Sequence, residues 1–340
     1  MVAPAHTSAH TLPASYARYL VELVARWDVP PAKLLDGLPI SLETLNDPAA
    51  RMGVEEVEHL TARARALTGE DALGVYLALQ IPISAHGYVG FAAMTARTLR
   101  EAIELAVQYA PTRTGVFGFR LEVEGGEAAI ILEEYVDLRS ARDVVVFALL
   151  GSIAHAGRTL LGRDLHGRLE VAFPEPPYFR RFARSIPGTV LFGRPQNRLV
   201  FDRQALDCPL PTHDPVALQL AREQCERELA HYGAAGAFLL RVRGAMPKKE
   251  GVCTLEEVAR RLHVSPRTLK RRLAAAGTSY ARLVEEFRQA RAEQLLRDAS
   301  LSVDEIAARL GYCDAAALTR AFRRWTGTTP AAYRRMLRST

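Results

Sequence analysis

One pattern occurs twice in the last third of the chain, as TLEEVARRLHVSPRTLKRRLAAAG (Thr254–Gly277) and as SVDEIAARLGYCDAAALTRAFRRWTG (Ser302–Gly327). Each copy has a capping residue and an amphipathic segment, then a short turn, a second capped segment and a final glycine. This order is typical of a helix-turn-helix, whose second helix can lie in the major groove of DNA. The repeat therefore predicts an all-α domain with two helix-turn-helix units that contact double-stranded DNA.

The two copies match at their caps and at their apolar positions. Thr254 corresponds to Ser302 with an offset of 48 residues, and Ser265 corresponds to Asp314 with an offset of 49. The other matched pairs are Ala259 with Ala307, Leu262 with Leu310, Leu269 with Leu318, Arg271 with Arg320 and Leu273 with Phe322. Because caps and core positions agree together, we expect the same local fold in both copies. We also expect the four capped helix N-termini to lie near DNA phosphates.

The polar residues of each second helix are expected to face away from the core. In the first copy they are Arg267, Thr268, Lys270 and Arg271, all of which can donate hydrogen bonds. The second copy has Ala316 in place of Arg267 and Thr319 in place of Lys270. Arginine suits the O6 and N7 atoms of guanine, whereas alanine and threonine suit the thymine methyl group. We therefore expect the first copy to be the stronger base reader, and the second to position the protein or to read methyl groups.

Between the copies, strong helix formers with apolar residues at helical spacing predict one continuous helix at about Tyr280–Asp298. A helix of this length would span ~28 Å, comparable with the ~34 Å between successive major-groove faces on one side of DNA. A helix at about 237–246 leads into the repeat. A last helix after Thr329-Pro330 is expected to support the second copy through Tyr333 and Leu337.

The distribution of charge agrees with a DNA-binding C-terminal part. The chain of 340 residues has a net charge of +6. Residues 251–340 contain 17 Lys and Arg against 9 Asp and Glu, whereas the other residues contain 27 against 29. The basic excess therefore lies in the part with the repeat, as expected where phosphates are the partner. A solvated basic face is the alternative.

The sequence before the repeat predicts a flexible arm at 1–14 and a mixed α/β domain at 15–208. Helices are expected at about 15–27, 54–67, 70–81, 98–110, 140–161 and 177–185, and strands at about 117–123, 128–134, 168–173 and 198–202. The clearest pair is GVFGFRLEVEG and AAIILEE, in which alternating apolar residues flank a Gly125-Gly126 turn. The fold class expected is thus an α/β domain followed by the all-α DNA-binding domain at 236–340.

Residues 209–235 are expected to form a linker and a helix between these domains. PLPTHDP (209–215) is rich in proline, and Asp214 can cap the helix that follows. Leu218, Ala221, Cys225 and Leu229 form an apolar stripe on that helix. The stripe can pack on its own domain, or it can form an interdomain or dimer contact, and the sequence leaves both open.

The sequence shows no catalytic motif of the G-x-S-x-G, H-E-x-x-H, P-loop or dinucleotide-binding kind. His86 lies in an apolar context and is expected to be structural. A surface position is favoured for Arg113, and pairing with an anionic ligand is the alternative. His6 and His10 lack a third ligand nearby, so no metal site is expected. The lining of an effector pocket cannot be read from the sequence.

The four cysteines, at 208, 225, 253 and 313, have no metal-binding spacing and are expected to be free thiols in a reducing cytosol. The N-terminus lacks the basic and apolar regions of a signal peptide. The most apolar run, Val144–Ile153, is too short to cross a bilayer and predicts a buried helix. We therefore expect a cytoplasmic, nucleoid-associated protein without a membrane partner or a cofactor.

The repeat resembles the DNA-binding domain of the AraC/XylS family of bacterial transcription regulators over about residues 237–337. Its most specific part is GYCDAAALTRAFRRWTGTTPAAYRR, at 311–335. The resemblance implies a seven-helix domain whose two second helices touch bases. The residues carried over are Arg267, Lys270 and Arg271 in the first unit and Ala315, Ala316, Thr319 and Arg320 in the second. Ala315 and Ala316 depart from the longer polar residues of many relatives, which argues against strong hydrogen-bonded readout by the second unit.

The first part of the chain resembles the arabinose-binding-like domain of ornithine- and arginine-utilisation regulators. The stretches that resemble it are HGYVGFAAMTARTLREAIELAVQYA (86–110) and FGRPQNRLVFDRQALDCPLPTHDP (192–215). The resemblance implies effector sensing and dimerisation, and it does not imply that arabinose is the ligand.

Together these observations predict a sequence-specific transcription regulator, an activator that responds to a small-molecule effector. Its expected partners are operator DNA, RNA polymerase, the effector and a second copy of the chain, and it is not expected to be an enzyme. One alternative is a DNA-repair alkyl acceptor fused to a helix-turn-helix. That chemistry needs an activated thiolate, and Cys208 and Cys225 are isolated in sequence. The other alternative is an architectural DNA binder without an effector.

Overall fold

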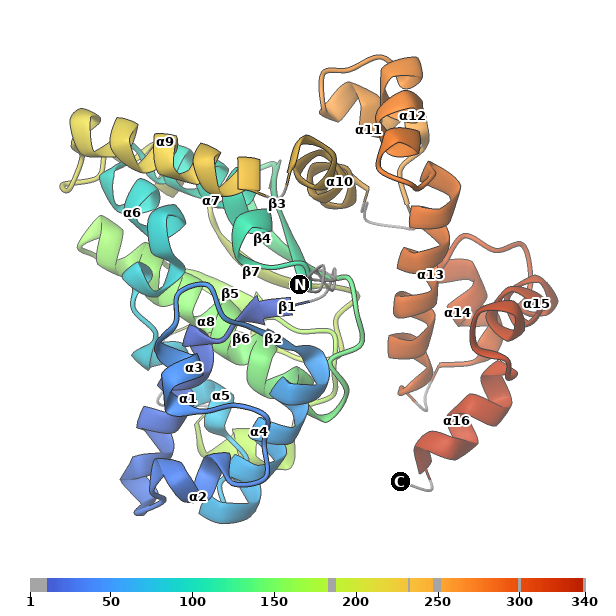
Figure 1. Ribbon diagram of the computed structural model, residues 1–340, viewed down its shortest axis with the longest axis horizontal. Coiled ribbons are helices and arrows are strands. Elements are labelled where there is room, and N and C mark those ends of the chain that lie inside the picture. The colour runs from blue at the N-terminus through green and yellow to red at the C-terminus, as the bar shows by residue number, and fades with distance from the viewer. Residues whose placement is uncertain (1–10, 183–187, 232, 247–251, 299–300, 339–340) are drawn as a thin grey trace, which may run out of the picture. The chain divides into compact units, whose positions relative to one another are not determined.

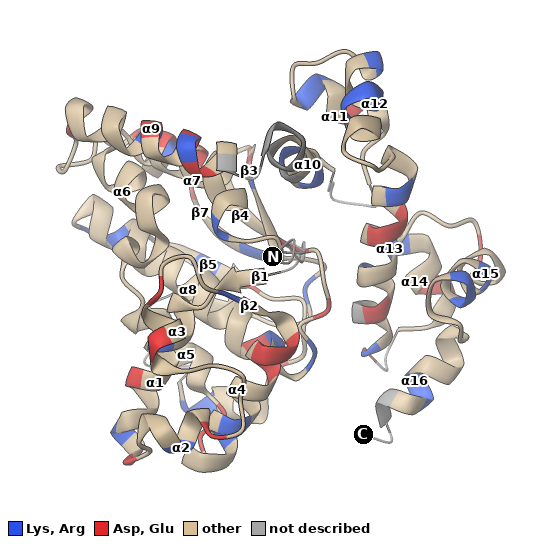
Figure 2. Cartoon of the chain, viewed as in Figure 1, with Lys and Arg blue, Asp and Glu red and all other residues tan. Residues whose placement is uncertain are grey.

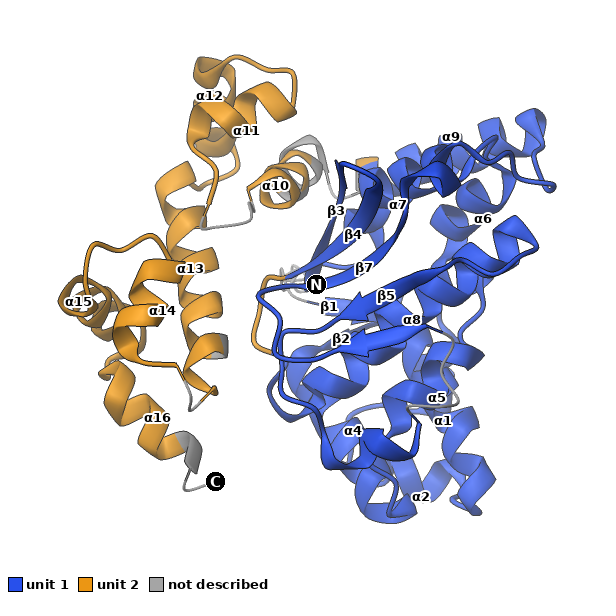
Figure 3. Cartoon of the chain, turned by 180° about the vertical axis from the view of Figure 1, so that it is seen from behind, with its two compact units in different colours: residues 1–133, 138–229 blue, residues 134–137, 230–340 orange. Residues whose placement is uncertain are grey.

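The computed structural model describes residues 11–182, 188–231, 233–246, 252–298 and 301–338. The chain divides into two compact units, coloured separately in Figure 3. Unit 1 comprises residues 1–133 and 138–229, and unit 2 comprises residues 134–137 and 230–340. The N-terminal unit is α/β and the C-terminal unit is helical (Figure 1), so the predicted fold class is confirmed. Unit 1 continues to Leu229, well beyond the end at 208 that was expected for the N-terminal domain.

Unit 1 contains a five-stranded sheet with the order β3-β4-β7-β5-β6. The strands are β3 (Phe117–Glu124), β4 (Glu127–Glu134), β5 (Gly167–Glu170), β6 (Thr189–Leu191) and β7 (Asn197–Asp202). β7 pairs antiparallel with both β4 and β5, whereas β5 and β6 are parallel. Gly125 has a φ of 58° in the β3–β4 turn, a conformation that glycine adopts without strain.

The helices of unit 1 precede, interrupt and follow this sheet. They are α1 (Ser15–Val24), α2 (Pro31–Leu35), α3 (Leu42–Asn46), α4 (Val54–Thr68), α5 (Leu73–Gln80), α6 (Gly87–Thr95), α7 (Leu99–Arg113), α8 (Arg142–Leu161) and α9 (Pro215–His231). Short 3-10 helices lie at Ala25–Trp27, Ile83–His86, Arg139–Ala141, Pro177–Arg181 and Arg203–Asp207. One apolar core joins α1, α3, α4 and α5, and a second joins α6, α7 and α9 to one face of the sheet.

The expected flexible arm at 1–14 is wrong for its last four residues, and residues 1–10 lie outside the described part of the chain. Thr11–Pro13 form strand β1, which pairs antiparallel with β2 (Arg51–Gly53). Ala14 is fully buried, and its amide donates a hydrogen bond to the carbonyl of Ala50. The sequence pattern missed this strand because three residues are too few to show an alternation.

Helix α8 was expected at about 140–161 and is observed at Arg142–Leu161. Together with the 3-10 turn before it, it is long and apolar enough to meet a composition test for a membrane span. In the structure it packs along α5, and Val144, Phe147 and Leu150 are buried. It is therefore the central core helix of unit 1, as the buried-helix interpretation expected.

The stripe on α9 packs on its own domain. Leu218, Ala221 and Cys225 belong to the core that α7 and the sheet share, and Leu229 is also buried. At the edges of this contact the Tyr109 hydroxyl donates to Glu226 Oε1 at 2.7 Å, and Arg222 Nη2 lies 2.6 Å from Glu101 Oε1. The apolar stripe is thus covered within unit 1, and the interdomain or dimer interpretation of that stripe is wrong.

Other expectations for unit 1 also differ from the structure. Helix α6 was not expected, because it is short, contains two glycines and is apolar on nearly all sides, which obscures a helical period. The helix expected at 177–185 is a 3-10 turn at Pro177–Arg181, and residues 183–187 lie outside the described part. At the start of α7, the Thr98 hydroxyl accepts from the Glu101 amide, and the Glu101 carboxylate accepts from the Arg97 amide.

Unit 2 contains seven helices among its described residues. They are α10 (Gly233–Ala245), α11 (Leu255–Arg261), α12 (Pro266–Ala275), α13 (Tyr280–Leu296), α14 (Val303–Arg309), α15 (Ala315–Thr326) and α16 (Pro330–Arg338). The first half of α13 packs in a core with α10, α11 and α12, and its second half packs in a core with α14 and α15. α13 therefore holds the two helix-turn-helix units on one helix of 17 residues, ~25 Å long.

Candidate nucleic-acid interface and effector cavity

The four predicted caps are all formed. Thr254 and Ser302 make complete capping boxes with Glu257 and Glu305. Ser265 Oγ accepts from the Thr268 amide at 3.1 Å. Asp314 Oδ1 accepts from the Ala317 amide at 2.6 Å, and the Ala315 amide donates to Asp304 at 3.3 Å. A side-chain oxygen thus fixes the first turn of α11, α12, α14 and α15, as the sequence predicted.

Three of these helix N-termini carry a carboxylate, which makes them less suited to lie near a phosphate. Glu257 and Glu305 lie at the starts of α11 and α14, and Asp314 caps α15. A negative charge at a helix N-terminus satisfies the amides that would otherwise attract an anion. Only the start of α12 has no carboxylate: Ser265 caps it, Pro266 is its first residue and Arg267 its second. Among the four caps, the start of α12 is therefore best suited to lie near a phosphate.

The turns of the two units have the same geometry despite different residues. His263 and Gly311 are both left-handed, with φ of 53° and 75°. The amides that follow, at Val264 and Tyr312, each donate over 2.9 Å to the carbonyl of Ala259 or Ala307. The second copy uses glycine at this strained position and the first uses histidine. Cys313, which follows, is the extra residue that changes the offset from 48 to 49.

Helix α12 presents a cationic face to solvent. Leu269 and Leu273 are completely buried, whereas Arg267, Lys270 and Arg271 are exposed. In the described part of the chain, none of these three side chains forms a hydrogen bond or an ion pair. Thr268 differs from them, because its hydroxyl lies 2.9 Å from Ser265 Oγ and belongs to the cap. Three cations at helical spacings of three and four are therefore free to meet DNA (Figure 2).

Helix α15 presents a mixed face. Leu318 and Phe322 are completely buried, and Ala316 and Arg320 are exposed. Ala315 and Thr319 are partly buried. The face therefore offers small apolar groups and one cation, as the comparison of the copies predicted.

Arg323 continues this face and was missed by the sequence argument. It is exposed, lies one turn beyond Arg320 and two turns beyond Ala316, and corresponds to Ala274 in the first helix-turn-helix. Its neighbour Arg324 differs, because Arg324 Nη2 pairs with Glu285 of α13 at 2.5 Å. Extending the alignment of the copies by one more turn would have found Arg323.

Two residues of α16 were expected to support the second helix-turn-helix, and the structure shows this for one of them. The ring of Tyr333 lies 5.4 Å from that of Phe322 in an edge-to-face contact. The side chain of Leu337 lies outside the described part of the structure. Tyr333 thus ties α16 to the core of the second unit.

We expect Ser265→Ala to destabilise unit 2 by about 1 kcal/mol, because it removes the oxygen that accepts from the Thr268 amide. Urea unfolding followed by the fluorescence of Trp325, in a Trp27→Phe background, would measure this. Ser265→Asp should restore the stability, because aspartate also caps. Equal stability of Ser265→Ala and the parent would show that the cap contributes nothing.

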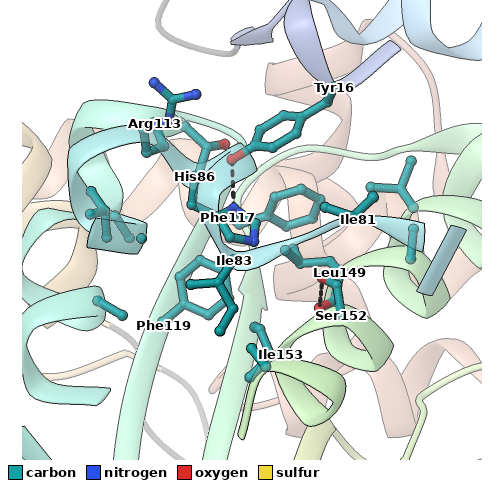
Figure 4. Close-up of a pocket in the computed structure, with 18 of the residues that line it drawn as sticks. Tyr16, Ile81, Ile83, His86, Arg113, Phe117, Phe119, Leu149, Ser152 and Ile153 are labelled. Atoms are coloured by element: carbon teal, nitrogen blue, oxygen red, sulfur yellow. Dashed lines mark hydrogen bonds between the residues drawn. The ribbon is translucent and has the colours of Figure 1, made fainter. Parts of the chain in front are cut away.

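Unit 1 encloses an apolar cavity of about 260 Å³ between α1, α7, α8 and the sheet (Figure 4). Most of the wall is aliphatic and aromatic, including Ile83, Phe117, Phe119, Leu149 and Ile153. Among the described residues, no aspartate or glutamate lines the cavity, and Arg113 is the only arginine or lysine that does. Enclosed apolar cavities of this kind are where proteins bind small molecules.

The polar end of the cavity is formed by Tyr16, His86 and Arg113 (Figure 4). The Tyr16 hydroxyl lies 2.8 Å from His86 Nδ1, and the guanidinium of Arg113 lies 5.8 Å from the centre of the Tyr16 ring. Burial, and then the nearby Arg113 charge, lower the pKa of His86 to about 4. Burial raises the pKa of Tyr16. At neutral pH both side chains are therefore uncharged, and Arg113 carries the positive charge of this end.

The neutral state of His86 predicts a pH-dependent stability of unit 1. An unfolded histidine binds a proton below about pH 6.5, whereas folded His86 binds one only near pH 4. The unfolded state thus gains protons first, so stability is complete above pH 6.5 and falls as the pH decreases to 4, by up to about 3 kcal/mol. Trp27 fluorescence in a Trp325→Phe background reports unfolding of unit 1. The loss should be smaller in His86→Gln than in a His59→Gln control, and equal losses would contradict the neutral His86.

The double helix-turn-helix and the attached cavity domain define the class of this protein as a DNA-binding transcription regulator. Residues 29–210 match the arabinose-binding N-terminal domain of AraC transcription regulators, and residues 258–336 match a helix-turn-helix domain. The chain is similar to the ornithine utilization regulator of Pseudomonas aeruginosa, with 32% identity over 98% of this chain and 99% of that protein. It is also 29% identical to an uncharacterized HTH-type transcriptional regulator of Mycobacterium bovis, over 95% of this chain and 96% of that one.

Among solved structures, a transcriptional regulator, CdpR, from Pseudomonas aeruginosa covers 94% of this chain and 98% of its own, with 23% identity and a TM-score of 0.42. The family assignment rests on the sequence matches above. The chain belongs to the AraC family of transcription regulators.

Proposed function

We propose that this chain is an effector-responsive activator that reads its operator mainly through α12. The observation that carries this proposal is the face of Arg267, Lys270 and Arg271, which is exposed while the opposite face of α12 is buried. Arginine can contact guanine with two hydrogen bonds, and phosphate contacts by other cations fix the register. Thr268 acts through the Ser265 cap, and that cap lies near a phosphate.

We infer a weaker role for the second unit. Ala315, Ala316 and Thr319 read thymine methyl groups, Arg320 reads a base edge, and Arg323 contacts the backbone. The caps Thr254, Ser302 and Asp314 stabilise their helices, and the carboxylates of Glu257, Glu305 and Asp314 keep phosphates at a distance. The ~25 Å helix α13 holds α12 and α15 for neighbouring major grooves.

The cavity of unit 1 is the proposed effector site. A ligand that binds one conformation more tightly shifts the population toward it, and so can change DNA affinity or contacts with RNA polymerase. The cytoplasm, where DNA and polymerase lie, is the proposed location, in association with the nucleoid.

A homodimer is proposed through the outer face of α9 rather than through its buried stripe. Val216 and Leu220 are 69% and 59% exposed. The segment before α9 hydrogen-bonds to Met94 and Thr95 at the end of α6, and Tyr88 and Phe91 in the first half of α6 are also exposed. Exposed apolar residues on adjoining helices favour association. Sedimentation of Leu220→Glu against the parent tests this contact, and an unchanged mass would remove it.

The enzyme alternative finds little support in the thiols. An alkyl acceptor needs an activated thiolate, but burial raises the pKa of Cys225 to about 12. Cys208 Sγ accepts from Arg163 Nη2 at 3.0 Å, which favours the alternative, whereas no group of three potential metal ligands that could activate a thiol occurs in the described residues. A single cysteine that reacts rapidly with a thiol probe at neutral pH would revive this alternative.

A thermal-shift screen of small metabolites on the full-length protein tests effector binding, because a ligand of the folded state raises the melting temperature. A fragment ending at residue 210 would lack α9 and expose the core that α9 covers. Ligands from the screen should change the affinity for a DNA site selected by the protein from a random pool. Binding without any change in DNA affinity or transcription would contradict the proposed function.

A further inference from the structure

The chemistry of the cavity wall restricts the effector. Besides Tyr16, three described side chains with a hydroxyl line the cavity, and each of these hydroxyls already has a hydrogen-bond partner. Thr61 donates to Val57 O and Glu58 O, Thr114 accepts from the Val116 amide, and Ser152 donates to Leu149 O. A sugar would bury several hydroxyl groups against an aliphatic wall without partners, which is costly. An ammonium group would find no carboxylate among the lining residues. The wall therefore suits an apolar body.

The position of Arg113 favours a negatively charged ligand. Its Nε is fully shielded from solvent and has no hydrogen-bond partner, and its Nη2 makes only a long contact of 3.5 Å to Ala85 O. Within the described residues no carboxylate forms an ion pair with it. Arg113 is partly exposed, but holding its shielded and unpartnered Nε in an apolar wall is costly unless an anion pairs with the guanidinium. The planar group fits a carboxylate through two parallel hydrogen bonds.

The neighbours of Arg113 add donors and no competing charge. The Tyr16 hydroxyl and the His86 ring lie at the same end of the cavity (Figure 4). Both are neutral at pH 7, as described above, so neither can replace an anion as the partner of Arg113. Gly87 leaves space for the guanidinium, because a Cβ there would lie 3.2 Å from Arg113 Nη1.

We propose that the effector is an apolar monocarboxylate whose carboxylate pairs with Arg113 beside Tyr16, while its body fills the cavity. The proposal rests on the proposed effector function of this site. A volume of about 260 Å³ holds roughly ten non-hydrogen atoms, if each takes about the volume of a water molecule. A medium-length acyl chain or an aryl-alkyl acid has this size. A diamino acid such as ornithine has a similar size but brings two ammonium groups that the cavity cannot pair.

The test compares octanoate with octanamide, octylammonium and L-ornithine by calorimetric titration of the full-length protein. Octanamide has the shape of octanoate without its charge. Octanoate should bind at least about 10-fold more tightly than each of the other three, as expected for a shielded charged hydrogen bond. Hexanoate and dodecanoate have a shorter and a longer chain than octanoate, and they test which acyl chain length the cavity accepts. Equal binding of octanoate and octanamide, or tighter binding of L-ornithine, would overturn the proposal, as would no binding of any of the three carboxylates.

Matched variants locate the carboxylate. Arg113→Gln should weaken octanoate at least about 10-fold and leave octanamide unchanged, which also shows that the cavity remains folded. Arg26→Gln, at an exposed arginine of the same unit that does not line the cavity, should leave both unchanged. Tyr16→Phe should weaken octanoate by a smaller factor. Full octanoate affinity in Arg113→Gln would overturn the assignment.

The same titrations separate this proposal from the proposed function. If octanoate binds through Arg113 but DNA affinity and transcription stay unchanged, the ligand class stands and effector control fails. If a neutral or cationic metabolite binds in the cavity and changes DNA affinity, effector control stands and the monocarboxylate fails.

Discussion

Arg271→Ala should weaken binding to the selected DNA site by about 1–3 kcal/mol, a loss of roughly 5- to 150-fold in affinity. Arg271 is exposed on α12, next to the buried Leu269 and Leu273 that fix the helix on its unit. Its side chain has no partner among the described residues, so no folded contact is lost with it. Because a base contact carries the loss, binding to random DNA should fall much less, and specificity should relax at one base pair.

Two controls make this result interpretable. Arg282→Ala removes the same charge from unit 2, at a side chain that is 70% exposed and pairs with Glu286 on α13. It should reduce affinity for selected and random DNA alike, and only slightly. Arg320→Ala tests the second unit. If Arg320→Ala or changes at Ala316 disturb site selection more than Arg271→Ala does, the roles of the two units are reversed.

Phe322→Ala should destabilise unit 2 by about 3–5 kcal/mol, because it leaves a cavity where a large side chain is now completely buried. The Phe322 ring contacts Trp325 and Tyr333 edge-on, at 6.4 and 5.4 Å between centroids. Its loss removes the contact between α15 and α16 along with the core. Unfolding in urea, followed by Trp325 in a Trp27→Phe background, would show an earlier transition.

In Phe322→Ala we expect weaker DNA binding, because the second helix-turn-helix loses order. The first helix-turn-helix has its own core around Leu269 and Leu273, so it should still bind DNA, with lower affinity. Cys313→Ala, at an exposed position of the same unit, should change neither stability nor binding. A destabilisation below about 1 kcal/mol in Phe322→Ala would contradict the core assignment.

The repeated unit could be predicted in detail because its information is local. Caps, apolar spacing and terminal glycines lie within about 25 residues of one another, and Thr254, Ser265, Ser302 and Asp314 all cap as expected. The left-handed turns at His263 and Gly311 did not need to be known, because the residues around them already fixed two helices. The connecting helix was placed correctly, but it ends at Leu296, two residues before the expected end.

The lining of the cavity could not be predicted, because its residues come from segments far apart in the sequence. Tyr16 lies on α1, His86 ends a 3-10 turn and Arg113 ends α7. The sequence showed an isolated histidine and an arginine beside a strand, and it favoured a surface position for Arg113. The structure places Arg113 in the wall of the cavity, so that expectation is wrong and the alternative of an anionic partner is now the one we propose. The same limit applies to α9, whose stripe could be read but whose partner could not.

The central claim, that the two helix-turn-helix units read a sequence, is tested most directly by competition binding. The full-length protein is titrated with the DNA site that it selects from a random pool, and with random DNA of equal length at the same salt concentration. A specific regulator should bind the selected site on the order of 10³-fold or more tightly. Affinities within about tenfold of each other would mean that phosphate contacts carry the binding, and they would make the chain an architectural DNA binder instead.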